Sequence, residues 1–155
     1  MRAIELAKFY SSRYRETFRE DMDEMKMHKL LYLAQRESLI RYGMPLFDEG
    51  IYAFKHGPVI KEIRSAFQSG DLPCASAETL MPYDRQEMID DNFKAYAAKE
   101  SWSLSRLTHC EESWKRARRD PASGGGDRLM PVDSIRRDAD RIRERRRRLT
   151  AMKGC

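Results

Sequence analysis

One predicted helix constrains the fold more than any other feature of the sequence. Between residues 24 and 42, apolar side chains cover about half of the helix circumference, a wider face than a surface helix usually shows. The residues of this face are Met27, Leu30, Leu31, Leu33, Ala34 and Ile40. Asp23 suits the start of the helix, and Gly43, followed by Pro45, ends it. We interpret it as the central helix of the single core that 155 residues can hold, with at most an appendage.

Apolar residues at three- and four-residue steps predict further helices around this one. The first spans residues 2–18, on the stripe Ala3, Leu6, Tyr10, Tyr14 and Phe18. Pro58 suits the first residue of the next helix, which Gly70 ends. Residues 71–82 are typical of a loop. Beyond them, one helix carries Met88, Ile89, Phe93 and Tyr96, and a single longer stretch carries Leu104, Leu107, Trp114 and Ala117.

A strand is predicted over residues 51–56, where β-forming residues alternate and Gly57 and Pro58 end the run. A lone strand needs a partner, and we expect residues 45–48, just before it, to supply one. The predicted fold class is therefore mainly α: a compact helical domain of about five to six helices, with a short β-hairpin or strand insert around residues 45–57.

The net charge of +5 lies entirely in the C-terminal part of the chain. Residues 1–120 carry 20 Lys and Arg against 20 Asp and Glu, whereas residues 121–155 carry 10 against 5. We expect a body over 1–120, a glycine-rich linker over 121–130 and a basic amphipathic helix over 131–155. Candidates for contact with a polyanion or an acidic partner are Arg143, Arg145, Arg146, Arg147 and Arg148.

Several function classes are excluded by what the sequence lacks. Its longest apolar run has five residues, far below the roughly 20 of a membrane-spanning helix, and residues 1–10 do not resemble an export signal. We expect a cytoplasmic protein with no membrane partner. Three cysteines without a paired spacing, and histidines without metal-ligand spacing, predict no metal site. Phosphate-loop, dinucleotide and nucleophile-elbow motifs are also absent, so we expect no cofactor and no enzymatic activity.

Four blocks of residues resemble one known family. In chain order they are Lys29 to Gln35, Tyr42 to Glu49, Ala53 to Val59, and Leu104 to His109 with Trp114 and Lys115. Together they are similar to the SocA-like antitoxin domain, also called the Panacea domain. The resemblance implies a mainly helical domain, from bacteria, phages or mobile elements, that neutralises a cognate toxin encoded beside it. In one branch of the family the antitoxin delivers the toxin to a AAA+ protease. The resemblance implies neither a cofactor nor catalysis.

The candidate partner-binding residues come from the last two of these blocks: Lys55, His56, His109, Trp114 and Lys115. Lys55 and His56, at a strand end, are either solvated or in contact with a partner. Trp114 is either a core residue or an interface anchor. On one continuous helix, His109 and Trp114 would be about 140° apart and need not share a face.

We therefore expect an antitoxin that acts by direct protein–protein binding. Two alternatives stay open: an adaptor that presents the toxin to a AAA+ protease, and a module that binds nucleic acid through its basic tail alone.

Overall fold

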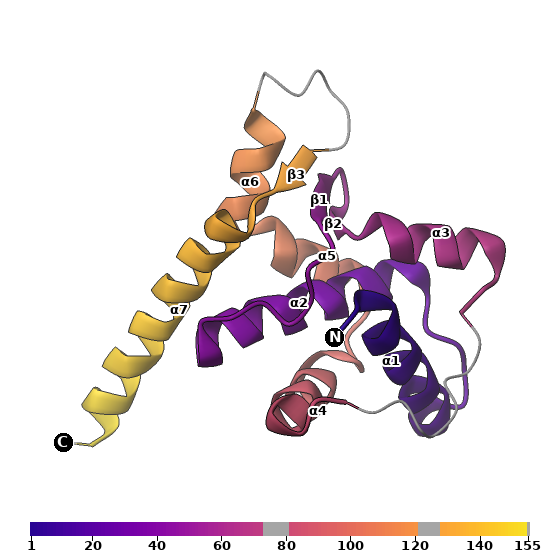
Figure 1. The fold of residues 1–155 in the computed structure, drawn as a ribbon. Coiled ribbons are helices and arrows are strands. Elements are labelled where there is room, and N and C mark those ends of the chain that lie inside the picture. The colour runs from indigo at the N-terminus through magenta and orange to yellow at the C-terminus, as the bar shows by residue number, and fades with distance from the viewer. Residues whose placement is uncertain (73–80, 121–127, 155) are drawn as a thin grey trace.

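Helix α2 (Glu24–Tyr42) crosses the middle of the molecule, as its wide apolar face predicted (Figure 1). The computed structural model describes residues 1–72, 81–120 and 128–154. Every α2 residue from Lys26 to Ile40 is buried. The Asp23 carboxylate accepts the N–H of Lys26 at 2.8 Å and so caps the first turn. At the other end Gly43, with φ +70°, takes the left-handed conformation that ends the helix.

The described residues contain seven α-helices and a small sheet, which confirms the mainly α fold class. One helix more than expected forms because the stretch from Leu104 to Ala117 is two helices that break at Cys110. The helices around α2 are α1 (Ala3–Phe18), α3 (Lys61–Ser69), α4 (Gln86–Tyr96), α5 (Ser101–His109), α6 (Glu112–Arg119) and α7 (Val132–Lys153), with a 3-10 turn η1 (Tyr83–Arg85) before α4.

The sheet has three short antiparallel strands in the order β2-β1-β3. They are β1 (Ile51–Phe54), β2 (Gly57–Val59) and β3 (Arg128–Met130). The predicted strand is confirmed, but its expected pairing with residues 45–48 is wrong. The chain instead turns back at Lys55 and His56, and Gly57, whose φ is +120°, begins β2. Pro58 consequently lies in β2 and does not begin a helix; α3 starts at Lys61.

The segment before β1 is held by a buried side chain of α2. The Gln35 side-chain oxygen accepts the N–H groups of Leu46 and Phe47, at 2.6 and 3.2 Å. Its amide nitrogen donates to the carbonyl of Phe47 at 2.8 Å. These bonds satisfy backbone groups that an additional strand would otherwise pair, so the segment stays irregular and still closes the core.

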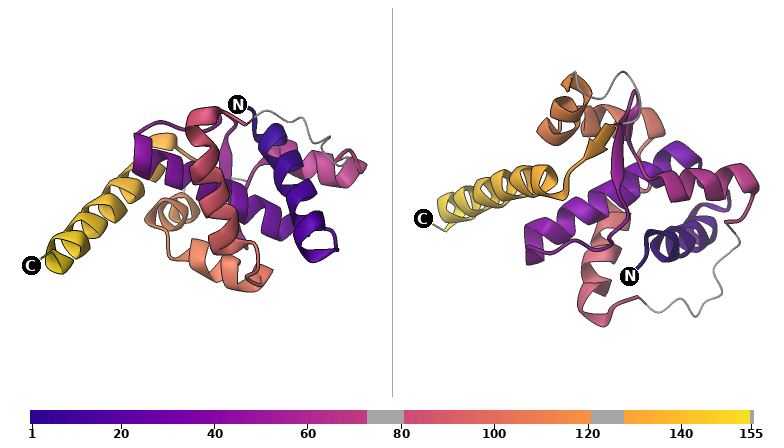
Figure 2. Two further views of the ribbon diagram at one scale, coloured as in Figure 1. Left: turned by 90° about the horizontal axis from the view of Figure 1, so that it is seen from below. Right: turned by 45° about the horizontal axis from the view of Figure 1, so that its top comes forward.

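The C-terminal part of the chain belongs to the same core. Of the predicted linker over 121–130, residues 121–127 lie outside the described residues, but 128–130 form β3. Met130, Ile135 and Ala139 are buried in the cluster that surrounds α2. The first half of α7 packs on the body, because its apolar stripe is covered. Its C-terminal end projects away from the body (Figures 1 and 2).

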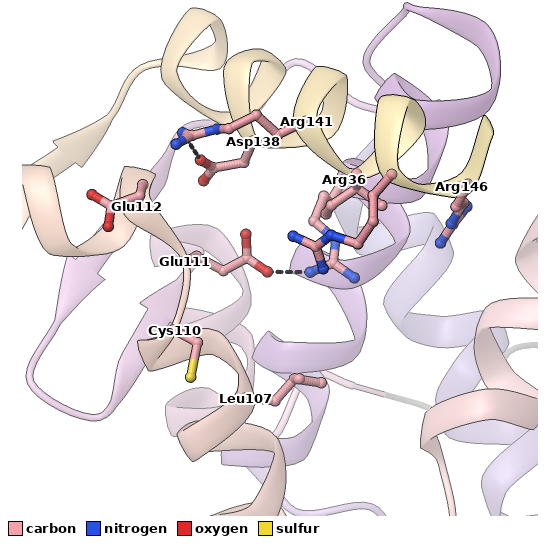
Figure 3. A pocket seen from close by; sticks show the side chains of 10 residues that line it. Arg36, Leu107, Cys110, Glu111, Glu112, Asp138, Arg141 and Arg146 are labelled. Carbon is pink, nitrogen blue, oxygen red and sulfur yellow. Dashed lines mark hydrogen bonds and ion pairs between the residues drawn. The ribbon is translucent and has the colours of Figure 1, made fainter. Parts of the chain in front are cut away.

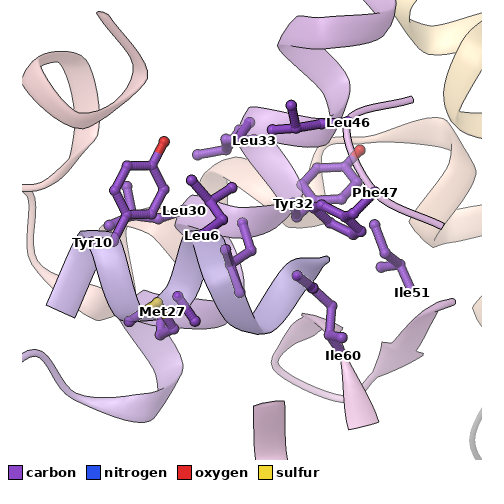
Figure 4. Packing of buried hydrophobic residues seen from close by; sticks show 14 of the residues in the cluster. Leu6, Tyr10, Met27, Leu30, Tyr32, Leu33, Leu46, Phe47, Ile51 and Ile60 are labelled. Atoms are coloured by element: carbon purple, nitrogen blue, oxygen red, sulfur yellow. The ribbon is translucent and has the colours of Figure 1, made fainter. Parts of the chain in front are cut away.

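The core joins α1, α2 and α4 through side chains that pack around α2 (Figure 4). Leu6 and Tyr10 of α1 meet Leu30 of α2. Asn92 of α4 donates to the Tyr10 hydroxyl at 3.0 Å and to the Leu30 carbonyl at 3.1 Å. The Tyr10 hydroxyl donates in turn to the carbonyl of Ile89 at 3.2 Å. This polar link fixes how the three helices pack.

A second buried polar group of α2, His28, is held in its neutral form. Its Nδ1 accepts the N–H of Ile60 at 3.2 Å, while Nε2 lies 3.2 Å from the Glu24 carboxylate. Burial lowers the pKa of His28 to about 3, and the charges of Lys29 and Arg64 add to this effect.

We expect folding stability to fall on acidification because of His28. Between its folded pKa of about 3 and its ordinary value of 6.5, the unfolded chain binds more protons, so stability drops as pH falls. The contribution is about 2.5 kcal/mol between about pH 7 and pH 4.5. Urea unfolding of wild type and His28→Asn over this range measures it, since the asparagine Oδ1 takes the place of Nδ1 and can accept the Ile60 N–H. Parallel stability curves for the two proteins would contradict the prediction.

Candidate partner-binding site

Three of the four motif blocks meet at the turn between β1 and β2. The turn residues Lys55 and His56 are exposed. Ser105 of α5 donates from its hydroxyl to the carbonyl of His56. From α2, the Lys29 ammonium donates to the carbonyl of Pro58 at 3.1 Å. Two helices thus hold this turn in one conformation.

Lys29 is a buried cation beneath the turn, with only 1% of its surface exposed. Burial lowers its pKa to about 8, and the nearby carboxylates Asp23 and Glu24 oppose the shift. The side chain leaves little room around it, because a Cβ at Gly57 would lie 2.7 Å from its Cε. The apolar pattern of this block did not predict a role for Lys29.

His109 and Trp114 also hold the turn. The break at Cys110 brings their rings together, stacked with centroids 4.2 Å apart, although one continuous helix would have separated them. The Trp114 indole N–H donates to the carbonyl of Phe54 at 2.9 Å. Burial lowers the pKa of His109, and the charge of Lys29 lowers it further. Both residues are half-buried, so each packs against the protein and keeps part of its surface exposed.

Sequence reasoning missed Trp102, the most exposed tryptophan near the turn. Its side chain is 58% exposed, and its ring meets that of His56 edge to face, with centroids 5.2 Å apart. The available signal was that Trp102 lies outside the apolar stripe of its helix. The predicted Lys115 is exposed and pairs with Glu112 at 3.9 Å. We call the hairpin surface the set Lys55, His56, Trp102, His109 and Trp114.

The five arginines of the C-terminal helix have different surroundings. Arg143 donates to the carbonyls of Leu39 and Ile40, both at 2.7 Å, in the last turn of α2. Arg146 binds both oxygens of Glu37, at 2.8 and 3.1 Å. These two arginines therefore dock α7 onto α2.

The other three arginines lie on the exposed part of α7. Arg147 and Arg148 share the carboxylate of Glu144, at 3.9 and 3.3 Å. The side chain of Arg145 makes no hydrogen bond or ion pair with the part of the chain that the structure describes. The predicted basic set therefore divides into two docking residues and three that remain accessible.

A groove of about 480 Å³ lies between α7 and the junction of α5 with α6 (Figure 3). At its floor, Arg36 and Glu111 form an ion pair in which both side chains are more than nine-tenths buried. Asp138 accepts the N–H of Ser113 at 2.9 Å and pairs with Arg141 at 2.7 Å. We call it the α7 groove; its lining residues are Arg36, Leu107, Cys110, Glu111, Glu112, Asp138, Arg141, Ile142, Arg145 and Arg146.

Two features are missing from the described residues. No helix there combines the length and the apolar character needed to cross a membrane. No group of three or more His, Cys, Asp or Glu side chains is placed to hold a metal ion.

Comparison with known proteins gives one match. Residues 27–115 match the family model described as antitoxin SocA-like, Panacea domain. No curated protein and no solved structure matches the chain. The matched region runs from α2 into α6, so it includes the β1–β2 turn and all residues of the hairpin surface. Because the match covers more than half of the chain, the protein belongs to the family of SocA-like antitoxins with a Panacea domain.

Proposed function

We propose that this protein neutralises a cognate toxin by direct binding, without turnover, and that the hairpin surface makes the main contact. The observation that carries the proposal is an exposed tryptophan, Trp102, beside an exposed turn that the core holds rigidly. Tryptophan is enriched among the residues that dominate binding energy.

The rigidity of the turn favours tight binding. Ser105, Trp114 and Lys29 each hold a carbonyl of the hairpin, from three different helices. A surface ordered before binding loses little conformational entropy when the partner arrives. Lys55 adds a charge at the rim of the surface, where it contributes to steering and specificity.

Co-expression with the product of the adjacent gene tests the function. We expect the neighbour to arrest growth when expressed alone, and growth to return when this protein is present. The two proteins should also copurify. A harmless neighbour, or one that stays toxic in the presence of this protein, would refute the antitoxin role. Rescue only in strains with an intact AAA+ protease, with loss of the toxin, would favour the adaptor alternative over neutralisation by binding.

Trp102→Ala should weaken toxin binding about tenfold or more, because the exposed indole no longer fills a site on the partner. Isothermal titration with the purified neighbour measures the change in Kd. The matched control is Tyr83→Ala, which removes an aromatic ring that is 94% exposed on η1, outside the hairpin surface. Equal affinities for the two variants would show that the toxin binds elsewhere. Thermal unfolding of Trp102→Ala should stay close to wild type, since the side chain is mostly solvated.

A further inference from the structure

We infer that the α7 groove is a second docking site, which takes a segment of the bound toxin that carries one carboxylate and an apolar side chain. The inference rests on the proposed function and adds to it a separate surface and the chemistry of its occupant. Leu107, in the groove, lies five residues after Trp102 on α5, which places the two about 140° apart around the helix.

Unsatisfied guanidinium groups indicate an anionic ligand. Arg36 is 7% exposed, and its Nε has no hydrogen-bond partner within the described structure, although Nη1 pairs with Glu111. Arg145 lines the same groove and has no partner among the described residues. A buried donor without a partner costs free energy, which leaves the floor of the groove short of an acceptor. The Arg145 guanidinium is exposed, so a carboxylate from the toxin can reach it.

Apolar side chains indicate that the ligand is more than an ion. Leu107, 37% exposed, and the half-buried Ile142 line the groove. Leu149 follows Ile142 by seven residues, so both lie on the same face of α7. Leu149 is 52% exposed and Met152 is 74% exposed, both in the last turns of α7. A toxin segment lying along this helix would cover these side chains. The groove, at about 480 Å³, has room for a few side chains of that segment.

The acidic lining favours a protein segment over nucleic acid. Glu111, Glu112 and Asp138 all line the groove. They would repel the closely spaced phosphates of a nucleic acid backbone, whereas a single carboxylate can bind beside Arg145. Arg143 and Arg146 are already occupied by α2. The exposed leucine and methionine also match an apolar side chain better than a phosphate.

Charge reversal at two positions of one helix tests the site. With the purified product of the adjacent gene as the probe, Arg145→Glu should raise the Kd about tenfold. Arg148→Glu makes the same charge change on α7, but Arg148 is not among the residues that line the groove, so we expect less than a threefold change. Equal effects of the two variants would overturn the inference that the toxin docks in the groove, and would leave the hairpin surface as the binding site.

Cys110 provides an independent readout, because it is exposed and lines the groove. In a Cys74→Ser and Cys155→Ser background, the toxin should slow maleimide labelling of Cys110 at least about fivefold. Binding without slower labelling would overturn the inference and leave the proposed function intact. Absence of any toxin binding to wild type would refute both. Slower labelling caused by a DNA duplex of about 20 base pairs instead would show a nucleic acid site and overturn the inference.

Discussion

Glu111→Gln should lower the free energy of unfolding by about 3–5 kcal/mol, the largest effect we expect from any single substitution. The amide keeps the shape of the carboxylate but removes its charge, and so leaves the buried guanidinium of Arg36 without a counterion. Burial raises the pKa of Glu111 even though Arg36 opposes the rise, which shows that the pair carries a large desolvation cost. A buried charge without its counterion destabilises the fold more than the loss of both charges does.

Urea unfolding followed by circular dichroism measures this effect. Glu112→Gln is the matched control, since this neighbouring carboxylate is only half-buried and its loss should cost less than about 0.5 kcal/mol. The double variant Arg36→Met/Glu111→Leu removes both charges and should recover to within about 1 kcal/mol of wild type. A loss of less than about 1 kcal/mol for Glu111→Gln would show that water or Asp138 compensates Arg36.

The double variant also separates folding from binding at the α7 groove. It replaces the charged floor with apolar side chains while keeping the packing between α2 and α6. If a carboxylate of the toxin binds in this groove, the double variant should fold normally but bind the toxin more weakly than wild type does. Stability and affinity therefore report on different properties of the same two residues.

The helices were predictable because their signal is local. The apolar stripe of α1 and the wide face of α2 determine which side is buried, whatever surrounds them. The buried polar residues of α2 were not predictable, because each depends on a distant partner. Arg36 meets Glu111, 75 residues away, and Gln35 binds the backbone of the segment before β1. Hydropathy places such residues at the surface, and only tertiary contacts bring them inside.

The candidate site was likewise predictable in its location but not in its contacts. The motif blocks indicated the region around Lys55 and His56, and the structure places three of the blocks against one turn. The stacking of His109 on Trp114 could not be predicted, since it depends on the helix break at Cys110, for which the sequence has no glycine or proline. Trp102 was missed because a single exposed aromatic has no periodicity to reveal it.

Net charge was a poor guide to where the C-terminal segment lies. The basic residues of 131–155 suggested a separate helix, but charge counts do not show which side chains face the body. The burial of Ile135 and Ala139 places α7 against the body, and Arg143 and Arg146 then bind groups of α2. Beyond Arg146 the apolar stripe of α7 is no longer covered, since Leu149 is exposed.

Gly57→Ala should destabilise the protein by about 3–4 kcal/mol, because two costs act at one position. With φ at +120°, Gly57 has a backbone conformation that other residues rarely adopt, which costs about 1–3 kcal/mol. The new Cβ would also lie 2.7 Å from the Lys29 Cε and 2.8 Å from the Thr108 Oγ1. Lys29 cannot withdraw easily, because it is buried and donates to the Pro58 carbonyl. Moving it would leave a buried cation without its partner.

Gly70→Ala separates the two costs. Gly70 has φ +73°, but no atom lies within 4 Å of a Cβ built there, so only the backbone term of about 1 kcal/mol applies. The difference between the two variants in urea unfolding therefore measures the crowding against Lys29 and Thr108 together with the larger backbone cost at φ +120°. Equal losses would show that the turn shifts at no cost, and would contradict a rigid β1–β2 turn. If the losses differ as expected, Gly57→Ala should also weaken toxin binding at the hairpin surface, whereas Gly70→Ala, on the far end of α3, should not.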